Sequence, residues 1–464
     1  MLLRFCSHGP DRGSHQIVRV TFRLMKILHF SDAHITTTDA GNQFDHDSKI
    51  RAAIMDDLGK EGRITFDAIL VTGDIAYHGR AEEFARAKVW LENVRKKTDS
   101  PLDSVYVIPG NHDVNQAIVS KSSSLWELHQ SLRSNMPEED RLASLDKKLH
   151  DPFDFLAALA EYRFFANEYG CPTDPDKLAW VQVLDKVLED GTSVRLHGLN
   201  SALISDEEDK KGTLLLGATQ FHQFDSDPAY VNVVLCHHPH PWLMDGNSAN
   251  DFFRRQSQVV LCGHDHEIRA YKEDRSLRVF AGAVHPNPRE RHWEPCYHVL
   301  TLSIDTTAKR TLVARVETRV WRDRDKCFGP YVQENKTPYL EERIELPDWK
   351  MEPPPQPAIL DSKTLDSTVS SPKVMTAIST LTSDAYAAAR RRLIVHFYRL
   401  GIISRHEAAI EADVWEESDD SLTGQARWSR VFERAEKLHK LGALWAAVAA
   451  RDETLANQTN PFNP

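Results

Sequence analysis

The sequence predicts an α/β fold with layered sheets and helices, followed by a small all-α C-terminal domain. Five short apolar runs are each followed directly by polar side chains, as at the carboxyl ends of buried strands. Stretches with helical periodicity separate several of these runs, which is typical of a layered α/β domain. Beyond a stretch rich in Pro, Ser and Thr, the periodicity of the chain is helical.

The most informative of the five runs is Val105–Ile108, which Pro109 and Gly110 stop and turn. Asn111, His112 and Asp113 follow the turn. The other runs and the side chains after them are 26–30 with Asp32 and His34, 68–72 with Asp74, 231–236 with His237 and His238, and 258–262 with His264 and His266. Ligands of open α/β sheets bind at the carboxyl ends of strands, so we expect these side chains to form one site.

The side chains at these strand ends are carboxylate, amide and imidazole groups, which are metal ligands. Two metals fit this set better than one, with Asp74 as the natural bridging carboxylate. Two ions about 3.5–4 Å apart form a clamp for in-line displacement at phosphorus. The residues therefore predict a two-metal hydrolase of phosphate esters. The spacing does not show whether His237 or His238 binds metal.

The five motifs resemble those of the calcineurin-like metallophosphoesterases, in the family's order and across about residues 26–320. They are Asp32-x-His34, Gly73-Asp74, Gly110-Asn111-His112-Asp113, His237-His238-Pro239 and Gly263-His264-x-His266. The resemblance implies a β-sandwich flanked by helices, in αββα order. Among members, the pattern is most similar to the cyclic-nucleotide phosphodiesterase and repair-nuclease branches, which share these ligands.

The resemblance also implies roles for single residues. One metal would be held by Asp32, His34, Asp74 and His266, and the second by Asp74, Asn111, His237 and His264. The implied catalytic residue is His112, near the leaving group as an acid or charge stabiliser, and we expect Asp113 to orient His112 or the turn. His238 would support the turn. The implied metals are Mn or Fe, with Zn as an alternative.

The leading functional prediction is a phosphodiesterase for nucleotide-type substrates, acting by attack of a metal-bridging hydroxide. A DNA or RNA nuclease, a phosphoprotein phosphatase and a binding or scaffold protein with a vestigial site are the alternatives. The net charge of −11 argues against indiscriminate binding to nucleic acid. The six cysteines are scattered without CxxC spacing, which suits a reducing cytoplasm. No apolar run is long enough to predict a transmembrane helix.

The phosphoesterase domain is expected to span 25–346, after a dispensable extension of residues 1–24. Helices are predicted at 48–58 and 81–97, the second with Phe84, Ala87, Leu91 and Val94 on one face. Residues 116–190 are predicted to be a helical insertion that shapes the substrate pocket. Its aromatic residues Tyr162, Phe164, Phe165 and Tyr169 could stack on a base, although their helical spacing favours core packing. Strands at 277–281, 297–304 and 311–320 are expected in the outer part of a second sheet.

A linker is predicted at 347–373 and a helical domain at 374–464. Its expected helices are 384–400, one opened by a capping box from Ser404 to Glu407, and 424–450. The basic run 390–392 is interpreted as a solvated helix face, or else as a contact for an acidic partner or nucleic acid. The domain weakly resembles helical adaptor domains of bacterial signalling and defence effectors, through 432–435 and 441–445. That resemblance implies a protein partner.

Overall fold

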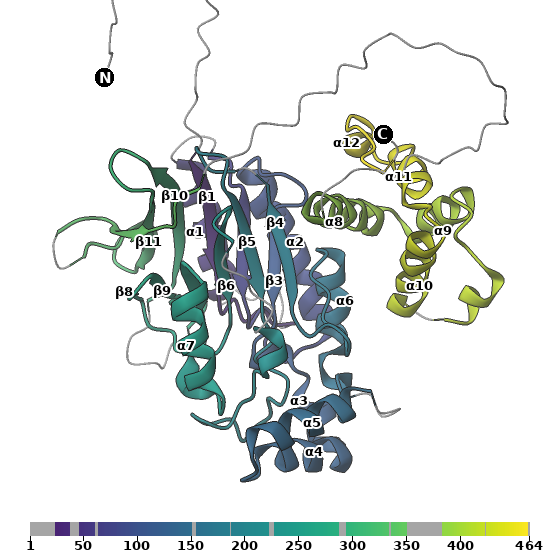
Figure 1. Cartoon of the computed structure of the whole chain (residues 1–464), viewed down its shortest axis with the longest axis horizontal. Coiled ribbons are helices and arrows are strands. Elements are labelled where there is room, and N and C mark those ends of the chain that lie inside the picture. Colours follow the sequence, from purple (N-terminus) through teal and green to yellow (C-terminus); the bar gives the residue numbers. More distant parts are fainter. Residues whose placement is uncertain are drawn as a thin grey trace, which may run out of the picture.

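A computed structural model describes residues 24–37, 46–60, 64–150, 155–185, 187–221, 227–286, 294–333, 336–349, 383–422 and 424–462. Within these residues, two β-sheets lie face to face with helices outside them (Figure 1). One apolar core contains side chains from both sheets. The predicted layered α/β fold with a helical C-terminal region is confirmed.

The first sheet contains three of the five strands that lead into the polar motifs. Its order is β12-β11-β10-β1-β2-β3, and β13 pairs with β11. The bounds are β1 Met25–Phe30, β2 Ala68–Thr72, β3 Val105–Ile108, β10 Cys296–Asp305, β11 Thr311–Arg322, β12 Cys327–Pro330 and β13 Leu340–Glu345. β1, β2 and β3 are parallel, so their carboxyl ends meet at one edge.

The second sheet contains the other two strands of this kind. Its order is β4-β5-β6-β7-β9-β8. The bounds are β4 Trp180–Leu184, β5 Ser193–Gly198, β6 Tyr230–Leu235, β7 Val259–Cys262, β8 Arg269–Glu273 and β9 Ser276–Phe280. β5, β6, β7 and β9 are parallel, and antiparallel β4 and β8 form the edges.

The prediction that the late strands all join the second sheet is wrong for two of them. Only 277–281 does so, as β9. β10 instead pairs antiparallel with β1, placing Leu302 opposite Met25, and β11 pairs with β10. This pairing joins residues far apart in the chain, which local periodicity does not report.

The helices outside the sheets begin with α1 His46–Lys60 and α2 Ala81–Lys97, and α7 Gly246–Gln256 follows β6. Phe84, Ala87, Leu91 and Val94 are all buried on α2, as predicted. Short 3-10 turns are η1 Asn111–Asp113, η3 Ala218–Gln220 and η4 His240–Trp242. The η1 turn consists of motif residues themselves, and η4 directly follows the motif His237-His238-Pro239, so both turns help to position the site.

The insertion is helical over most of its length. It contains α3 Gln116–Lys121, α4 Ser123–Arg133, α5 Glu138–Leu149, η2 Ala157–Leu159 and α6 Ala160–Glu168. Figure 1 shows α3, α4 and α5 at the end of the sheets to which β3 leads. The predicted helical insertion also contains a strand, Trp180–Leu184, which is the edge strand β4. Trp180 anchors this strand, because its buried indole donates to the Val107 carbonyl at 3.0 Å.

The C-terminal region contains α8 Ser383–Arg399, α9 Ile402–Glu411, η5 Glu417–Ser421, α10 Gly424–Lys437, α11 Leu441–Ala449 and α12 Glu453–Ala456. The prediction of a single helix over 424–450 is wrong, because His439 has a left-handed backbone (φ 54°) that separates α10 from α11. The predicted capping box is also wrong. Ser404 lies inside α9, which begins directly after Gly401.

The predicted linker lies mostly outside the described residues, and the predicted extension 1–24 lies outside them apart from Leu24. The boundaries 25–346 and 374–464 remain predictions. Among the described residues, no helix combines the length and the apolar composition that a bilayer crossing requires.

Candidate metal centre

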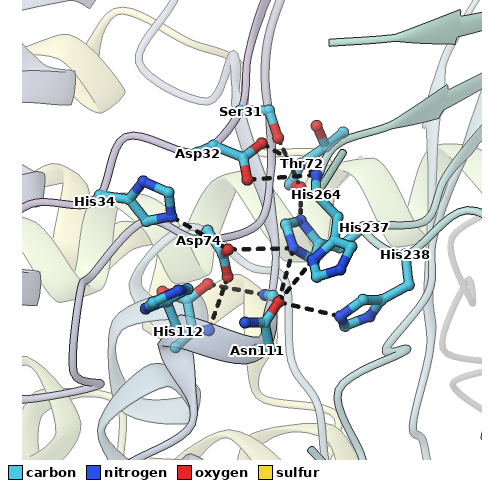
Figure 2. A network of polar contacts seen from close by, with 12 residues as sticks. Ser31, Asp32, His34, Thr72, Asp74, Asn111, His112, His237, His238 and His264 are labelled. Atoms are coloured by element: carbon cyan, nitrogen blue, oxygen red, sulfur yellow. Dashed lines mark hydrogen bonds and ion pairs between the residues drawn. The ribbon is translucent and has the colours of Figure 1, made fainter. Parts of the chain in front are cut away.

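The motifs after β1, β2, β3, β6 and β7 converge on one place between the sheets (Figure 2). Groups of side chains there have ligand atoms within 4.8 Å of one another. One group is Asp32, His34 and His266, and another is His237, His238 and His264. Asp74 joins further groups, with Asp32 and His237 and with His34 and His112. Every predicted ligand except Asn111 occurs in these groups. Asn111 is missing because the groups include His, Cys, Asp and Glu side chains alone.

Asn111 lies at the centre of the second group. Its Oδ1 atom is 3.3 Å from His237 Nε2, 3.1 Å from His238 Nε2 and 3.0 Å from His264 Nδ1. Asp74 lies between the two groups, with Oδ2 3.3 Å from His34 Nε2 and 3.4 Å from His237 Nε2. The arrangement is therefore two clusters of donors with a carboxylate between them.

The backbone at the site is strained. Five of the predicted ligands have a left-handed backbone, which residues other than Gly seldom adopt. Their φ angles are 53° for Asp32, 43° for His34, 50° for Asp74, 70° for His264 and 53° for His266. Main-chain hydrogen bonds hold this geometry, including His34 N–H to the Asp74 carbonyl at 2.9 Å. Such strain is concentrated at functional sites, where the surrounding structure maintains it.

Three glycines are required by the closeness of the ligands. A Cβ atom on Gly110 would lie 2.2 Å from Asp74 Oδ1, and one on Gly73 would lie 2.5 Å from His237 Nδ1. A Cβ on Gly263 would lie 2.1 Å from Ser31 Oγ and 2.8 Å from Asp32 Oδ2. No side chain fits at these positions without displacing a predicted ligand or its neighbour.

Backbone carbonyl groups fix the orientation of two imidazoles. His34 Nδ1 lies 3.0 Å from the His285 carbonyl, and His237 Nδ1 lies 2.7 Å from the Thr72 carbonyl. A carbonyl oxygen only accepts, so Nδ1 of each ring carries a proton. Each Nε2 atom then faces an acceptor oxygen, Asp74 Oδ2 for His34 and Asn111 Oδ1 for His237. Lone pairs that face each other need a cation between them, either a proton or a metal ion.

The electrostatics of the site favour a bound cation. Burial raises the pKa of Asp32, but the hydrogen bond and charge of His266 and the charge of His237 lower it to about 2. Burial likewise raises the pKa of Asp74, yet the charges of His237 and His112 hold it well below its usual value. Burial and then the charge of His237 lower the pKa of His264 to about 4. Burial lowers the pKa of His237, but the charge and hydrogen bond of Asp74 raise it to about 9, so a proton lies between His237 and Asp74 where a cation would bind. Ionised carboxylates are the form that binds metal, and a divalent cation would displace this proton.

Comparison with known proteins agrees with this geometry. The sequence model for calcineurin-like phosphoesterases matches residues 25–267, which is more than half of the chain. This chain belongs to the calcineurin-like phosphoesterase family. The family supports metal-dependent hydrolysis of phosphoesters, and the five motifs lie within the matched residues.

One relative of this chain is the metallophosphoesterase-like protein YydB of Bacillus subtilis. It is 22% identical over 305 residues, which cover 60% of this chain and 58% of YydB. This chain therefore spans less than two thirds of the length of that relative.

Two solved structures match this chain at low identity and with low TM-scores. Vacuolar protein sorting 29 of Cryptosporidium parvum is 11% identical, with 70% of this chain and 99% of that chain covered and a TM-score of 0.29. GAP50 of Plasmodium is 8% identical, with 70% and 90% covered and a TM-score of 0.35.

The predicted catalytic residue, His112, lies beside the first cluster. Its ring centroid is 4.7 Å from that of His34 and 5.0 Å from that of Tyr77, on which it stacks. His112 Nδ1 donates to the Tyr77 carbonyl at 2.8 Å, so Nε2 is the nitrogen left for a substrate. The main-chain N–H of His112 also donates to Asp74 Oδ1 at 2.8 Å, which ties the turn to the site.

Asp113 does not orient the His112 ring, because the Tyr77 carbonyl does so. The Asp113 carboxylate is fully buried and accepts main-chain N–H groups from Gly110 at 2.9 Å, Ile75 at 3.0 Å and Ala76 at 2.8 Å. Burial and then the charge of Asp74 raise the pKa of Asp113 to about 7. Of the two predicted roles, the structure favours orientation of the turn, and the catalytic prediction for Asp113 has no contact that supports it.

The sequence left the role of His238 open, and it did not reveal the contributions of Ser201 and Trp242 to the site. His238 reaches Asn111 Oδ1, and its Nδ1 lies 2.8 Å from Ser201 Oγ. Trp242 packs its ring edge-on at 4.1 Å from His264, and its indole N–H donates to Asp265 at 3.0 Å. The adjacent histidines were a signal for His238. Ser201 and Trp242 reach the site through long-range contacts that no local motif marks.

Proposed function

We propose that this protein hydrolyses phosphodiester bonds of nucleotide-type substrates at a site with two divalent cations. The position of Asp74 carries the proposal. Its Oδ2 atom lies at nearly the same distance from His34 in the first cluster and from His237 in the second. A carboxylate in this place can serve two ions at once, as two-metal hydrolases require.

The first ion would be held by Asp32, His34, Asp74 and His266, and the second by Asp74, Asn111, His237 and His264. Once bound, the ions would supply a water of lowered pKa as nucleophile and neutralise charge on the phosphoryl oxygens. Mixed imidazole and oxygen ligation suits Mn or Fe, with Zn as an alternative. His238 is a further candidate ligand of the second ion, because its Nε2 atom also reaches Asn111.

The chain itself supplies the group that assists the leaving oxygen. His112 is fixed by its Nδ1 hydrogen bond to Tyr77, which directs Nε2 to the substrate. An imidazolium at this position can donate the Nε2 proton to the leaving alkoxide. Asp113 keeps the Gly110 turn in place, and so holds Asn111 and His112 in register with Asp74.

The decisive experiment is hydrolysis after reconstitution with Mn²⁺. The panel contains bis-p-nitrophenyl phosphate, p-nitrophenyl phosphate, 2′,3′- and 3′,5′-cyclic nucleotides, a phosphopeptide and single- and double-stranded DNA. We expect turnover of the small diesters and cyclic nucleotides. Turnover of DNA alone would favour a nuclease, and turnover of the phosphopeptide alone would favour a phosphatase. Either result would contradict the proposal.

A further inference from the structure

A cavity of about 420 Å³ lies between the insertion and the loop after β5. The insertion contributes Gln116 and Lys121 from α3 and Trp126 from α4, and the loop contributes Asp206, Glu207 and Glu208. A volume of this size is in the range of small-molecule sites. The side chains around it combine a cation, an aromatic ring, an amide and three carboxylates.

Both walls of the cavity are connected to the metal centre. Gln116 Nε2 donates to the main-chain carbonyl of Asn111 at 3.4 Å, so a lining side chain contacts a predicted ligand residue. On the other wall, Ser201 binds His238, and Asp206 follows only five residues later. Each wall is thus linked to the metal centre, the first through the Gln116 hydrogen bond to Asn111 and the second through a chain segment of five residues.

Trp126 is the exposed aromatic side chain of this wall, with 43% of its surface accessible. Of the four aromatic residues that the sequence offered for stacking, Tyr162 and Phe165 are 0% and 3% exposed and belong to the core. Tyr169 packs against that core, and Phe164 is exposed but does not line this cavity. An indole that stays exposed beside a cavity can stack on a base, since every base has a π-face. Lys121 on the same wall can neutralise a phosphate.

The opposite wall is acidic and is held in place. Arg133 donates to both oxygens of Asp206 at 2.7 Å, and Gln130 donates to Glu208 at 3.2 Å. Carboxylates accept hydrogen bonds from the amino groups of bases and from ribose hydroxyls. In addition, the Gln116 Oε1 atom is buried without a hydrogen-bond partner among the described residues. An unpaired buried amide oxygen is costly, and a donor on a ligand would satisfy it.

We propose that this cavity is a nucleoside subsite, which binds one esterified arm of the phosphodiester. Trp126 stacks on the base, Lys121 pairs with phosphate, and the carboxylates and Gln116 accept from the base and ribose. The acidic wall favours bases that carry an amino group, such as adenine, over uracil. The inference rests on the proposed function and names the part of the substrate that the insertion recognises.

Calorimetric binding of AMP, UMP and adenosine to the full chain tests this subsite without relying on turnover. Wild type should bind AMP more tightly than UMP. Trp126→Ala should weaken AMP binding by about 5- to 150-fold, as for loss of one base–aromatic stack, and Trp126→Phe should restore most of it. Lys121→Ala should weaken the binding of AMP more than the binding of adenosine. The control Phe164→Ala, an exposed aromatic on α6, should leave the Kd for AMP unchanged.

The outcomes separate the subsite from the function. If Trp126→Ala and wild type bind AMP equally, or if wild type binds neither nucleotide, the subsite is wrong even when diesters are hydrolysed. If Trp126→Ala weakened the binding of single-stranded DNA but not the binding of AMP, the subsite would also be wrong, and a groove that binds a nucleic-acid strand would be favoured. Trp126-dependent AMP binding with no hydrolysis of any diester would support the subsite and contradict the proposed function.

Discussion

Arg391 of α8 donates to the main-chain carbonyl of Val105, the first residue of β3, at 2.7 Å. The same guanidinium bonds the Asp103 carbonyl and lies 3.9 Å from the centroid of the Tyr106 ring. Arg391 is only 4% exposed. The predicted roles of the basic run 390–392, a solvated face or a contact for an acidic partner, are therefore wrong for Arg391. Arg391 attaches the C-terminal helices to the beginning of β3. Asn111 lies beyond the other end of that strand.

Replacing Arg391 by Ala should release the C-terminal helices from the phosphoesterase domain. Two main-chain carbonyl groups, of which the Val105 carbonyl is buried, would lose a charged donor, and each lost hydrogen bond costs at most about 1.5–3 kcal/mol. Limited proteolysis and small-angle scattering should report faster cleavage between the domains and a larger radius of gyration. The control Arg392→Ala removes a more exposed pair with Asp103 and should have little effect. Equal behaviour of the two variants would contradict this account of docking.

Gly110→Ala should reduce metal binding while the fold is retained. The added Cβ would lie 2.2 Å from Asp74 Oδ1 and 2.5 Å from Asp74 N, so Asp74 must move. Overpacking of this kind costs about 1–3 kcal/mol. Metal analysis of the purified variant gives the number of ions per chain. Gly401→Ala is the matched control, because no atom lies within 4 Å of its added Cβ, and it should bind metal as wild type does.

The His112→Ala variant should retain its bound metal and hydrolyse phosphodiesters more slowly. Its imidazole is near the clusters but is directed by Tyr77, so its removal takes away an acid and no predicted metal ligand. Loss of a general acid lowers kcat by roughly 10²–10⁴-fold. Steady-state kinetics with bis-p-nitrophenyl phosphate, paired with metal analysis, measure both quantities. Loss of metal would show that the role given to His112 is wrong. His150→Ala, at an exposed histidine after α5, serves as the control.

Stability should decrease between pH 6.5 and pH 4 because of His298. This imidazole is buried on β10 beside His29, and burial lowers its pKa from 6.5 to about 4. In this window the unfolded chain binds a proton at His298 and the folded chain does not, so the free energy of unfolding falls as the pH falls. The full effect is about 3 kcal/mol and levels off below pH 4. Urea unfolding at several pH values measures it, and a His298→Gln variant with the same slope would contradict it.

The clustering of the strand-end side chains could be predicted from sequence because it is encoded locally. Each apolar run is short, each is followed by a donor, and Gly73, Gly110 and Gly263 mark the close approaches. Parallel strand ends then meet by the general geometry of such sheets. The left-handed backbone at Asp32 and Asp74 could not be predicted in this way, because the local conformational preferences of Asp oppose it. Long-range hydrogen bonds maintain this backbone.

The features that sequence reasoning missed depend on distant contacts. Arg391 bonds a carbonyl 286 residues away, and Tyr77, rather than Asp113, orients His112. The membership of β10 in the first sheet follows from its pairing with β1. The break between α10 and α11 depends on the backbone of His439, in a stretch whose apolar periodicity continues across it. None of these features has a local signature.

The central claim is that Asp74 serves two metal ions. Its most direct test is the metal content of wild type and Asp74→Ala after reconstitution with Mn²⁺ and removal of excess ions, with bis-p-nitrophenyl phosphate hydrolysis measured on the same samples. The account predicts two ions per chain in wild type, fewer than two in Asp74→Ala, and no turnover by the variant. One ion per chain in wild type, or two ions and full activity in Asp74→Ala, would contradict it.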